Sequence, residues 1–167
     1  GGSATVYLAR DERHDRDVAI KVLHADVSKT SGDRFLREIR VSARMQHPHV
    51  LPSYDSGHVD GRLFFVMPYV DGGSLRDKLN ERKSLPVVEA LQIARQVGVA
   101  LAHAHSLGII HRDVKPENIM FYHGMACLAD FGIARPLEEL EPGITAHGTL
   151  VGTPGYMSPE QFLTGYD

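Results

Sequence analysis

The chain has 167 residues, of which 43% are hydrophobic and 23% charged, with 16 glycines and 9 prolines. This is the composition of a folded globular protein with one domain or two small lobes, and it excludes collagen-like and disordered chains. The formal net charge of −3 argues against a protein that binds nucleic acid or an anionic membrane through clustered cations.

The first part of the chain is predicted to form an antiparallel sheet with one helix. Apolar and β-branched stretches between polar turns predict four strands, over residues 4–10, 18–23, 50–57 and 63–70. Between the second and third strands, Phe35, Leu36 and Ile39 recur at helical spacing and predict an amphipathic helix over residues 33–45. The Asp-Gly-Gly sequence at residues 71–73 then marks a boundary.

The second part of the chain is predicted to be mainly helical. Ser74 begins a short helix, and Pro86 begins a long one that continues to Leu107. Apolar residues at every third or fourth position give the long helix an apolar stripe: Leu91, Ala94, Val97 and Leu101. Short apolar segments then predict small strands that carry loops, at residues 109–110, 119–122 and 126–129. We therefore expect two lobes, residues 1–70 and 74–167, with a hinge over residues 67–73.

Cysteine and histidine spacing bears on compartment and metal binding. Cys127 is the only cysteine, so no disulfide forms within the chain, and we expect the thiol to be buried and inert. No apolar run approaches the ~20 residues that span a bilayer, and no signal segment opens the sequence; both points favour the cytoplasm. His47 and His49, like His103 and His105, are two residues apart, a spacing that disfavours a shared metal on a helix.

Residues 111–118, with the sequence HRDVKPEN, combine the groups that phosphoryl transfer needs. Asp113 would orient or deprotonate a hydroxyl, Lys115 would neutralise the moving phosphoryl group, and Asn118 would hold Mg²⁺. His111 is expected to be a packed residue that orients this loop. A polar surface turn is the alternative interpretation of the same residues.

Three further signals are ambiguous when each is taken alone. Asp130 follows a short apolar run and precedes Phe131-Gly132, which places a carboxylate at the end of a strand, although such turns are common. Lys21 ends the strand sequence Val-Ala-Ile-Lys and is equally well a solvated lysine. Glu38 lies beside the apolar stripe of the predicted helix and is equally well a surface acid.

Taken together and in this order, these motifs resemble those of the eukaryotic-type protein kinases, in particular the bacterial members that act on serine and threonine. The segment Ser158-Pro159-Glu160 extends the resemblance along nearly the whole chain. The resemblance implies an α+β, protein-kinase-like bilobal fold. Its N-terminal lobe would be an antiparallel sheet with one helix, and its C-terminal lobe would be mainly helical and incomplete.

The resemblance also implies a site for ATP and Mg²⁺. Lys21 would contact the α and β phosphates and be held by Glu38, while Asn118 and Asp130 would hold the metal ions. The first residues of the chain would form the end of a glycine-rich phosphate-binding loop: Gly1, Gly2, Ser3, Ala4 and Val6. The first glycine and the first strand of that motif would lie upstream, and Ala4 stands where a glycine is usual.

The adenine site follows from the same resemblance. Met67 would be the gatekeeper at the back of the pocket, the Pro68 carbonyl would accept a hydrogen bond from the adenine amino group, and Val70 would donate one. Three apolar residues would sandwich the purine ring: Val6, Ala19 and Met120.

Lys115 and Thr153 resemble the serine/threonine branch, so the implied acceptors are serine and threonine hydroxyls of proteins, with self-phosphorylation in trans as one case. Thr145 and Thr149 lie in a segment with little periodicity, where a phosphate would pair with Arg112. We group Thr153 with them as a regulatory position.

The predicted function is therefore that of a protein serine/threonine kinase controlled by phosphorylation. Two alternatives stay open: a nucleotide-binding scaffold of the pseudokinase kind, and a small-molecule phosphotransferase. Relatives of this kind continue beyond residue 160 into further helices, the first of which normally packs under the long helix. We therefore expect the apolar stripe of that helix to lack a partner, and this piece alone to be marginally folded and weakly active. The parent would be cytoplasmic or the cytoplasmic domain of a membrane-anchored protein.

Overall fold

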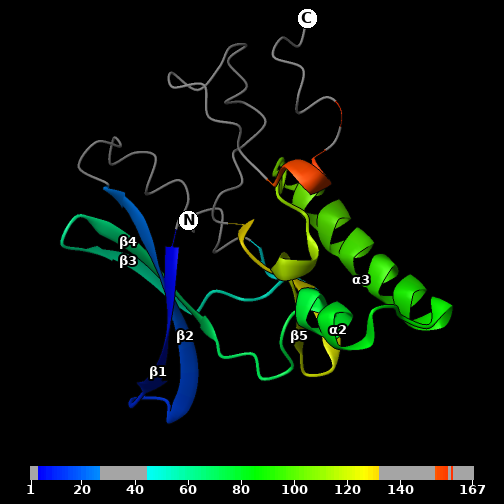
Figure 1. Ribbon diagram of the computed structural model, residues 1–167. Helices are drawn as coiled ribbons and strands as arrows, with labels where there is room; N and C mark the ends of the chain where they lie inside the picture. Colours follow the sequence, from blue (N-terminus) through cyan, green and yellow to red (C-terminus); the bar gives the residue numbers. More distant parts are fainter. Residues whose placement is uncertain (1–3, 27–44, 132–152, 158, 160–167) are drawn as a thin grey trace, which may run out of the picture.

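The computed structural model describes residues 4–26, 45–131, 153–157 and 159 (Figure 1). A sheet forms one side of the molecule, and two helices with a small hairpin form the other side. This arrangement confirms the predicted sheet followed by a helical part. The predicted helix over residues 33–45 lies almost wholly outside the described residues, which resume at Met45.

The sheet is antiparallel throughout, with strand order β1-β2-β4-β3. Its strands are β1 (Ala4–Asp11), β2 (Arg16–Asp26), β3 (Asp55–Val59) and β4 (Arg62–Pro68). The predicted hairpin is confirmed, with β1 and β2 in register from Ala4–Leu23 to Asp11–Arg16. Lys21 lies opposite Phe65 of the central strand β4, so its side chain starts from the middle of the sheet.

The stretch predicted as a strand over residues 50–57 is only partly a strand. β3 begins at Asp55, and the residues before it connect the sheet to the helical part. Val50 forms an isolated parallel bridge with Leu128, and the Leu51 N–H donates to the Leu128 carbonyl at 2.9 Å. Val50 is 4% exposed, which explains why this position is apolar. An apolar residue suits a buried connection as well as a strand, so the sequence alone did not distinguish the two.

The hinge residues pass close to the small hairpin and lead into helix α2 (Leu75–Arg82). A Cβ atom on Gly72 would lie 2.6 Å from the Phe121 carbonyl oxygen, so only glycine fits there. Ser74 caps α2 as predicted, in a capping box with Asp77: the Asp77 carboxylate accepts from the Ser74 N–H at 2.8 Å. The same hydrogen bonds from Ser74 lower the pKa of Asp77.

Helix α3 (Val87–Ser106) begins and ends within one residue of the predicted bounds, with Pro86 and Leu107 as its capping residues. Its buried residues are Ile93, Val97, Ala100 and Ala104. Of the apolar stripe, which was expected to lack a partner, Leu91 is 65% exposed and Ala94 is exposed, whereas Val97 is buried and Leu101 is partly buried. The helix carries small or apolar residues on more than one side, so periodicity alone does not select the side that packs.

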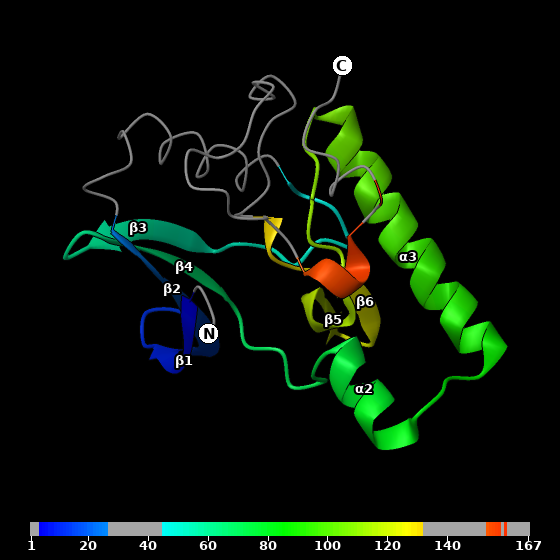
Figure 2. The ribbon, with the colours of Figure 1, turned by 45° about the horizontal axis from the view of Figure 1, so that its top comes forward.

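A hairpin of β5 (Ile119–Tyr122) and β6 (Met125–Leu128) lies between the two helices (Figure 2). β5 contacts α2 and β6 contacts α3, so the hairpin is fixed on both sides. Its β6 residues Ala126, Cys127 and Leu128 are at most 1% exposed and complete the core. None of the helices in the described part of the chain is long and apolar enough to cross a membrane.

Candidate active site

The loop before β5 and the end of β6 are tied together by the backbone. The short helix η2 (Pro116–Asn118) leads directly into β5, and the Ala129 N–H donates to the Asn118 carbonyl at 2.8 Å. Asp130, the next residue, has a positive φ of 67°, which turns the chain away from the strand. The hairpin thereby brings residues 113–118 next to the acid that follows β6.

Asp113 is the centre of a hydrogen-bond network. Lys115 Nζ lies 2.7 Å from Asp113 Oδ2, and Asn118 Nδ2 donates to the Asp113 carbonyl at 2.8 Å and to its Oδ2 at 3.1 Å. Partial burial opposes ionisation, but the bonds from Lys115, Thr153 and Asn118 outweigh it and lower the pKa of Asp113. The carboxylate is therefore ionised and held in one orientation at neutral pH.

Thr153 joins the same network from a distant part of the sequence. Its Oγ1 donates to Asp113 Oδ1 at 2.9 Å and accepts from Lys115 Nζ at 2.7 Å. The hydroxyl thus bridges the carboxylate and the ammonium group. Both functions of the hydroxyl are engaged, so Thr153 holds the loop in this structure; its regulatory role stays a prediction.

His111 fixes the loop from below. The ring is 1% exposed, its Nε2 lies 2.8 Å from the Ala129 carbonyl, and its Nδ1 accepts from the Asp113 N–H at 3.3 Å. This arrangement requires the neutral tautomer with hydrogen on Nε2, in accordance with the burial that lowers the pKa of His111. The ring also packs edge-on against Phe131, with centroids 4.6 Å apart. The predicted packing role of His111 fits this geometry.

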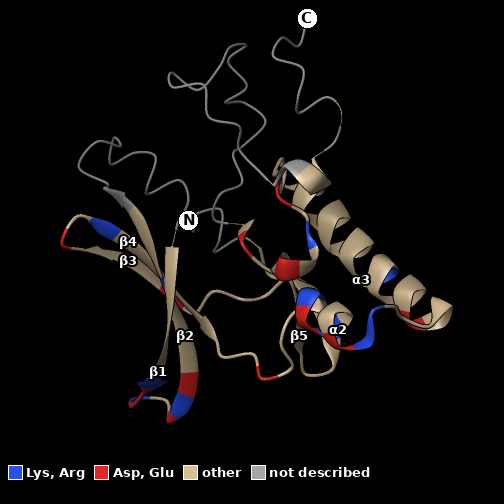
Figure 3. Ribbon diagram, in the orientation of Figure 1, with Lys and Arg blue, Asp and Glu red and all other residues tan. Residues whose placement is uncertain are grey.

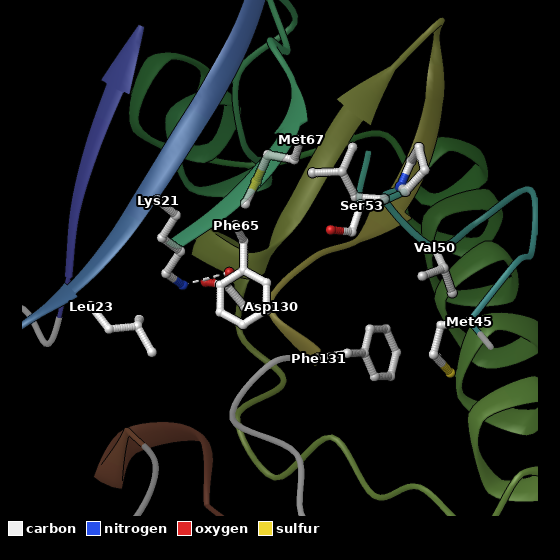
Figure 4. Close-up of a pocket in the computed structure, with 11 residues that line it drawn as sticks. Lys21, Leu23, Met45, Val50, Ser53, Phe65, Met67, Asp130 and Phe131 are labelled. Atoms are coloured by element: carbon white, nitrogen blue, oxygen red, sulfur yellow. Dashed lines mark ion pairs between the residues drawn. The ribbon is translucent and has the colours of Figure 1, made fainter. Parts of the chain in front are cut away.

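Lys21 and Asp130 form an ion pair between the sheet and the end of the hairpin (Figure 4). Lys21 Nζ lies 2.6 Å from Asp130 Oδ1, and the two side chains are 13% and 26% exposed. The partner expected for Lys21 from the sequence, Glu38, lies outside the described residues. The pair brings a cation and a carboxylate from opposite sides of the molecule to one place.

The donor set at this place fits a hard divalent cation. Asp130 supplies a carboxylate, and Asn118 uses its amide nitrogen on Asp113, which leaves its amide oxygen as the group for a metal. The described residues contain no cluster of three or more His, Cys, Asp or Glu side chains that could hold a metal alone. Mg²⁺ suits so small a protein contribution, because it usually keeps waters and substrate phosphates as its other ligands.

An apolar pocket opens beside the Lys21–Asp130 pair (Figure 4). Its walls include Met45, Phe65 and Phe131, and Met67 lies at one edge. Most of the residues predicted to enclose a purine do not line this pocket: Val6, Ala19, Pro68, Val70 and Met120. Of these residues, Ala19 pairs with Met67 in the sheet, and Val6 of β1 is 61% exposed.

Several predicted site residues lie outside the described residues: Gly1, Gly2, Ser3, Glu38, Thr145, Thr149, Ser158 and Glu160. Ala4 is the first residue of β1. Arg112 is described, and its backbone has a positive φ of 66°, a strained conformation that is frequent at functional sites. Its pairing with a phosphate stays a prediction.

The structure adds three residues that sequence reasoning did not single out. Arg76 of α2 contacts Glu117 of η2, with Nε to Oε1 at 2.9 Å, and its Nη2 donates to the hydroxyl of Tyr156. Tyr156 ends the short helix η5 (Pro154–Tyr156). Arg76 precedes Glu117 by 41 positions and Tyr156 by 80, so no local pattern could have linked them.

Comparisons with known proteins identify the family of the chain. A family model described as the protein kinase domain matches residues 1–166. The chain is 42% identical over 165 residues to the serine/threonine-protein kinase PknD of Mycobacterium tuberculosis and 41% identical over 168 residues to the serine/threonine-protein kinase PrkC of Bacillus subtilis. These alignments cover 97% and 99% of the chain but 24% and 26% of the relatives, so the chain spans about a quarter of their length.

A solved structure resembles the fold as well. The crystal structure of the Mycobacterium tuberculosis PknI kinase domain superposes with a TM-score of 0.70 at 39% sequence identity. The superposition covers 79% of this chain and 56% of that one. The overall fold of the chain is therefore similar to that of a bacterial kinase domain.

Proposed function

Since this chain belongs to the protein kinase domain family, we propose that it is a protein serine/threonine kinase domain that transfers the γ-phosphoryl group of ATP to hydroxyl groups of protein substrates. The observation that carries the proposal is the carboxylate of Asp113, held by Lys115, Thr153 and Asn118 at 2.7 to 3.1 Å. A surface turn would not require three partners to fix one carboxylate.

Asp113 acts mainly by orienting the acceptor hydroxyl. Its lowered pKa makes it a weak base toward an alcohol, so it takes the proton late, as the oxygen–phosphorus bond forms. Lys115, 2.7 Å from Asp113, supplies a positive charge next to the position of the transferred group. Because Thr153 also bonds both residues, their spacing is set before substrate arrives, which lowers the cost of reorganisation in the transition state.

Lys21, Asp130 and Asn118 form the proposed nucleotide and metal site. Mg²⁺, when bound, neutralises charge on the phosphates, and Asp130 and Asn118 are the residues that would hold it. Lys21 is already beside Asp130 at 2.6 Å, so the phosphates would be bound between the sheet and the hairpin. The adenine ring would occupy the side of Met67 formed by Val6, Ala19 and Met120, with hinge contacts from Pro68 and Val70.

We further propose that the chain divides into an N-terminal lobe (1–70) and a C-terminal lobe (74–167) around the hinge 67–73. We also propose that activity is controlled by a phosphate on Thr145 or Thr149, which would pair with Arg112. Self-phosphorylation in trans would supply that phosphate. ATP as substrate and the single buried thiol of Cys127, whose pKa burial raises, are in accordance with a cytoplasmic site of action.

The test is transfer of labelled phosphate from ATP to a generic protein substrate by the full chain and by Asp113→Asn. We expect label on serine or threonine and a loss of at least a hundredfold in the variant, within the range for a positioned base. Asp60→Asn, an exposed turn residue with a positive φ of 47° that asparagine tolerates, is the matched control. Equal labelling by Asp113→Asn, or binding of nucleotide without transfer, would overturn the proposal.

A further inference from the structure

Arg76 connects three segments of the chain at one point. Its Nε donates to Glu117 Oε1 at 2.9 Å, and its Nη2 donates to the Tyr156 hydroxyl. Its side chain is 33% exposed and that of Glu117 is 44% exposed, so the bridge lies at the surface and is accessible to a bound peptide. Figure 3 shows basic colour on α2 beside acidic colour on the short helix that precedes β5.

This bridge lies next to the acceptor site. Glu117 directly precedes Asn118, which donates to Asp113, and the Tyr156 N–H donates to the Thr153 carbonyl at 2.8 Å. Thr153 in turn donates to Asp113 at 2.9 Å. Each partner of Arg76 is therefore connected to the Asp113 carboxylate through one intervening residue, Asn118 or Thr153.

A carboxylate in this position would ordinarily attract a basic side chain of the substrate. Glu117 is instead neutralised within the chain. Partial burial opposes its ionisation, but the hydrogen bond from Arg76 and the charges of Arg76 and Lys115 outweigh burial and lower the pKa of Glu117. The guanidinium group presents its donors in a planar fork, and two of them are used on Glu117 and Tyr156.

We propose that Arg76 determines substrate charge preference by occupying Glu117, so that this domain does not select peptides with arginine or lysine beside the acceptor. The inference rests on the proposed kinase function. It assigns Arg76 as a specificity-determining residue that acts through Glu117. It also predicts that the Glu117 carboxylate would bind a basic residue of the substrate if Arg76 were removed.

The test compares pairs of serine peptides. The two peptides of a pair differ at one residue near the acceptor, which is arginine in one and alanine in the other. One pair is made for each of the three positions on either side of the acceptor. In the wild type the ratio of kcat/KM, arginine over alanine, should stay within about threefold of one. In Arg76→Gln and Arg76→Ala the ratio should rise about tenfold for at least one position, as expected for one new charge-assisted hydrogen bond at a half-exposed site.

Two controls isolate the role of Glu117. The double variant Arg76→Gln with Glu117→Gln should return the ratio to the wild-type value, because the uncovered carboxylate is gone. Arg82→Ala removes another arginine of the same helix, one that lies 3.5 Å from Glu89, and should leave the ratio unchanged. A rise that persists in the double variant, or an equal rise in Arg82→Ala, would contradict the assignment.

A binding measurement separates this inference from the proposed function. The same peptides with alanine at the acceptor position, labelled with a fluorophore, report affinity by anisotropy without any transfer. If Arg76→Gln binds the arginine peptide about tenfold more tightly than the wild type does, the inference stands even where no transfer is seen, and the kinase proposal alone fails. If transfer occurs but neither ratio nor affinity changes in the two Arg76 variants, the inference is wrong.

Discussion

The hydroxyl of Thr153 provides a quantitative test of the network around Asp113. Thr153→Val keeps the shape of the side chain and removes both hydrogen bonds, the one to Asp113 at 2.9 Å and the one from Lys115 at 2.7 Å. Each involves a charged group, and such bonds contribute about 1.5–3 kcal/mol. The Asp113 and Lys115 side chains are 14% and 22% exposed, so solvent screens them only in part.

The loss is reduced because Asp113 and Lys115 keep their direct contact at 2.7 Å. We therefore expect about 2 kcal/mol in the transition state, which corresponds to a fall in kcat of about thirtyfold at 1.36 kcal/mol per factor of ten. The KM for ATP should change little, because Thr153 does not contact Lys21 or Asp130. Steady-state transfer of labelled phosphate at saturating peptide measures both quantities.

Thr153→Ser is the matched control, since it keeps the hydroxyl and loses one methyl group. It should retain kcat within about threefold of the wild type. A Thr153→Val variant that folds and keeps wild-type kcat would show that Asp113 does not depend on this hydrogen bond. Equal losses in the serine and valine variants would show that the methyl group, and not the hydroxyl, matters; either result would refute the reasoning.

Two further predictions concern stability. Gly72→Ala should destabilise the fold by about 1–3 kcal/mol, because the added Cβ would lie 2.6 Å from the Phe121 carbonyl oxygen. The control Gly98→Ala in α3 adds a Cβ with no atom within 4 Å and should stabilise the fold by up to about 1 kcal/mol. Thermal unfolding that ranks the two variants the other way would contradict the contact at the hinge. The pKa of His111 is lowered by burial, so the unfolded chain takes up a proton that the folded imidazole resists, and stability should fall as pH drops below about 6.5. His47, whose pKa burial also lowers, contributes in the same direction. The free energy of unfolding of His111→Gln, measured with denaturant between pH 7.5 and 5.5, should therefore depend on pH less steeply than that of the wild type but still fall. An equally steep pH dependence in the variant would count against a neutral His111.

The residues of the proposed site could be selected from the sequence because their motifs are local and their order along the chain is specific. Asp113, Lys115 and Asn118 lie within six positions, and in the structure the side chains of Lys115 and Asn118 both lie within hydrogen-bond distance of the Asp113 carboxylate. Lys21 and Asp130 were predicted separately, and they meet at 2.6 Å. For Lys21 and Asp130 the residue type alone was ambiguous, and their roles were expected only from the resemblance to the protein kinases.

Packing choices could not be predicted in the same way. Helix α3 carries small and apolar residues on several faces, and tertiary packing, including that against β6, buries Ile93 and Ala100 while Leu91 is exposed. Val50 was predicted to lie in a strand because burial in a connection and burial in a sheet require the same apolar residue. The position of the apolar pocket beside Phe131 likewise depends on tertiary contacts.

The contacts of Arg76 depend on tertiary structure to an even greater degree. A single arginine on a short polar helix is ordinarily a solvated residue, and Glu117 would be interpreted as an exposed acid of the catalytic loop. Their pairing at 2.9 Å arises because α2 packs against η2 and β5. Side-chain bridges between distant segments are the part of a site that sequence patterns do not encode locally.

The most direct test of the account is to separate the role of Asp113 from that of Asp130. Affinity for a non-hydrolysable ATP analogue is measured with and without Mg²⁺ for the wild type, Asp113→Asn and Asp130→Asn, beside phosphate transfer with ATP. We predict that both variants lose transfer, that Asp130→Asn also loses the Mg²⁺-dependent part of the affinity, and that Asp113→Asn keeps it within about threefold. An Asp130→Asn variant that binds the Mg²⁺ complex as the wild type does, or an Asp113→Asn variant that transfers phosphate normally, would contradict the account.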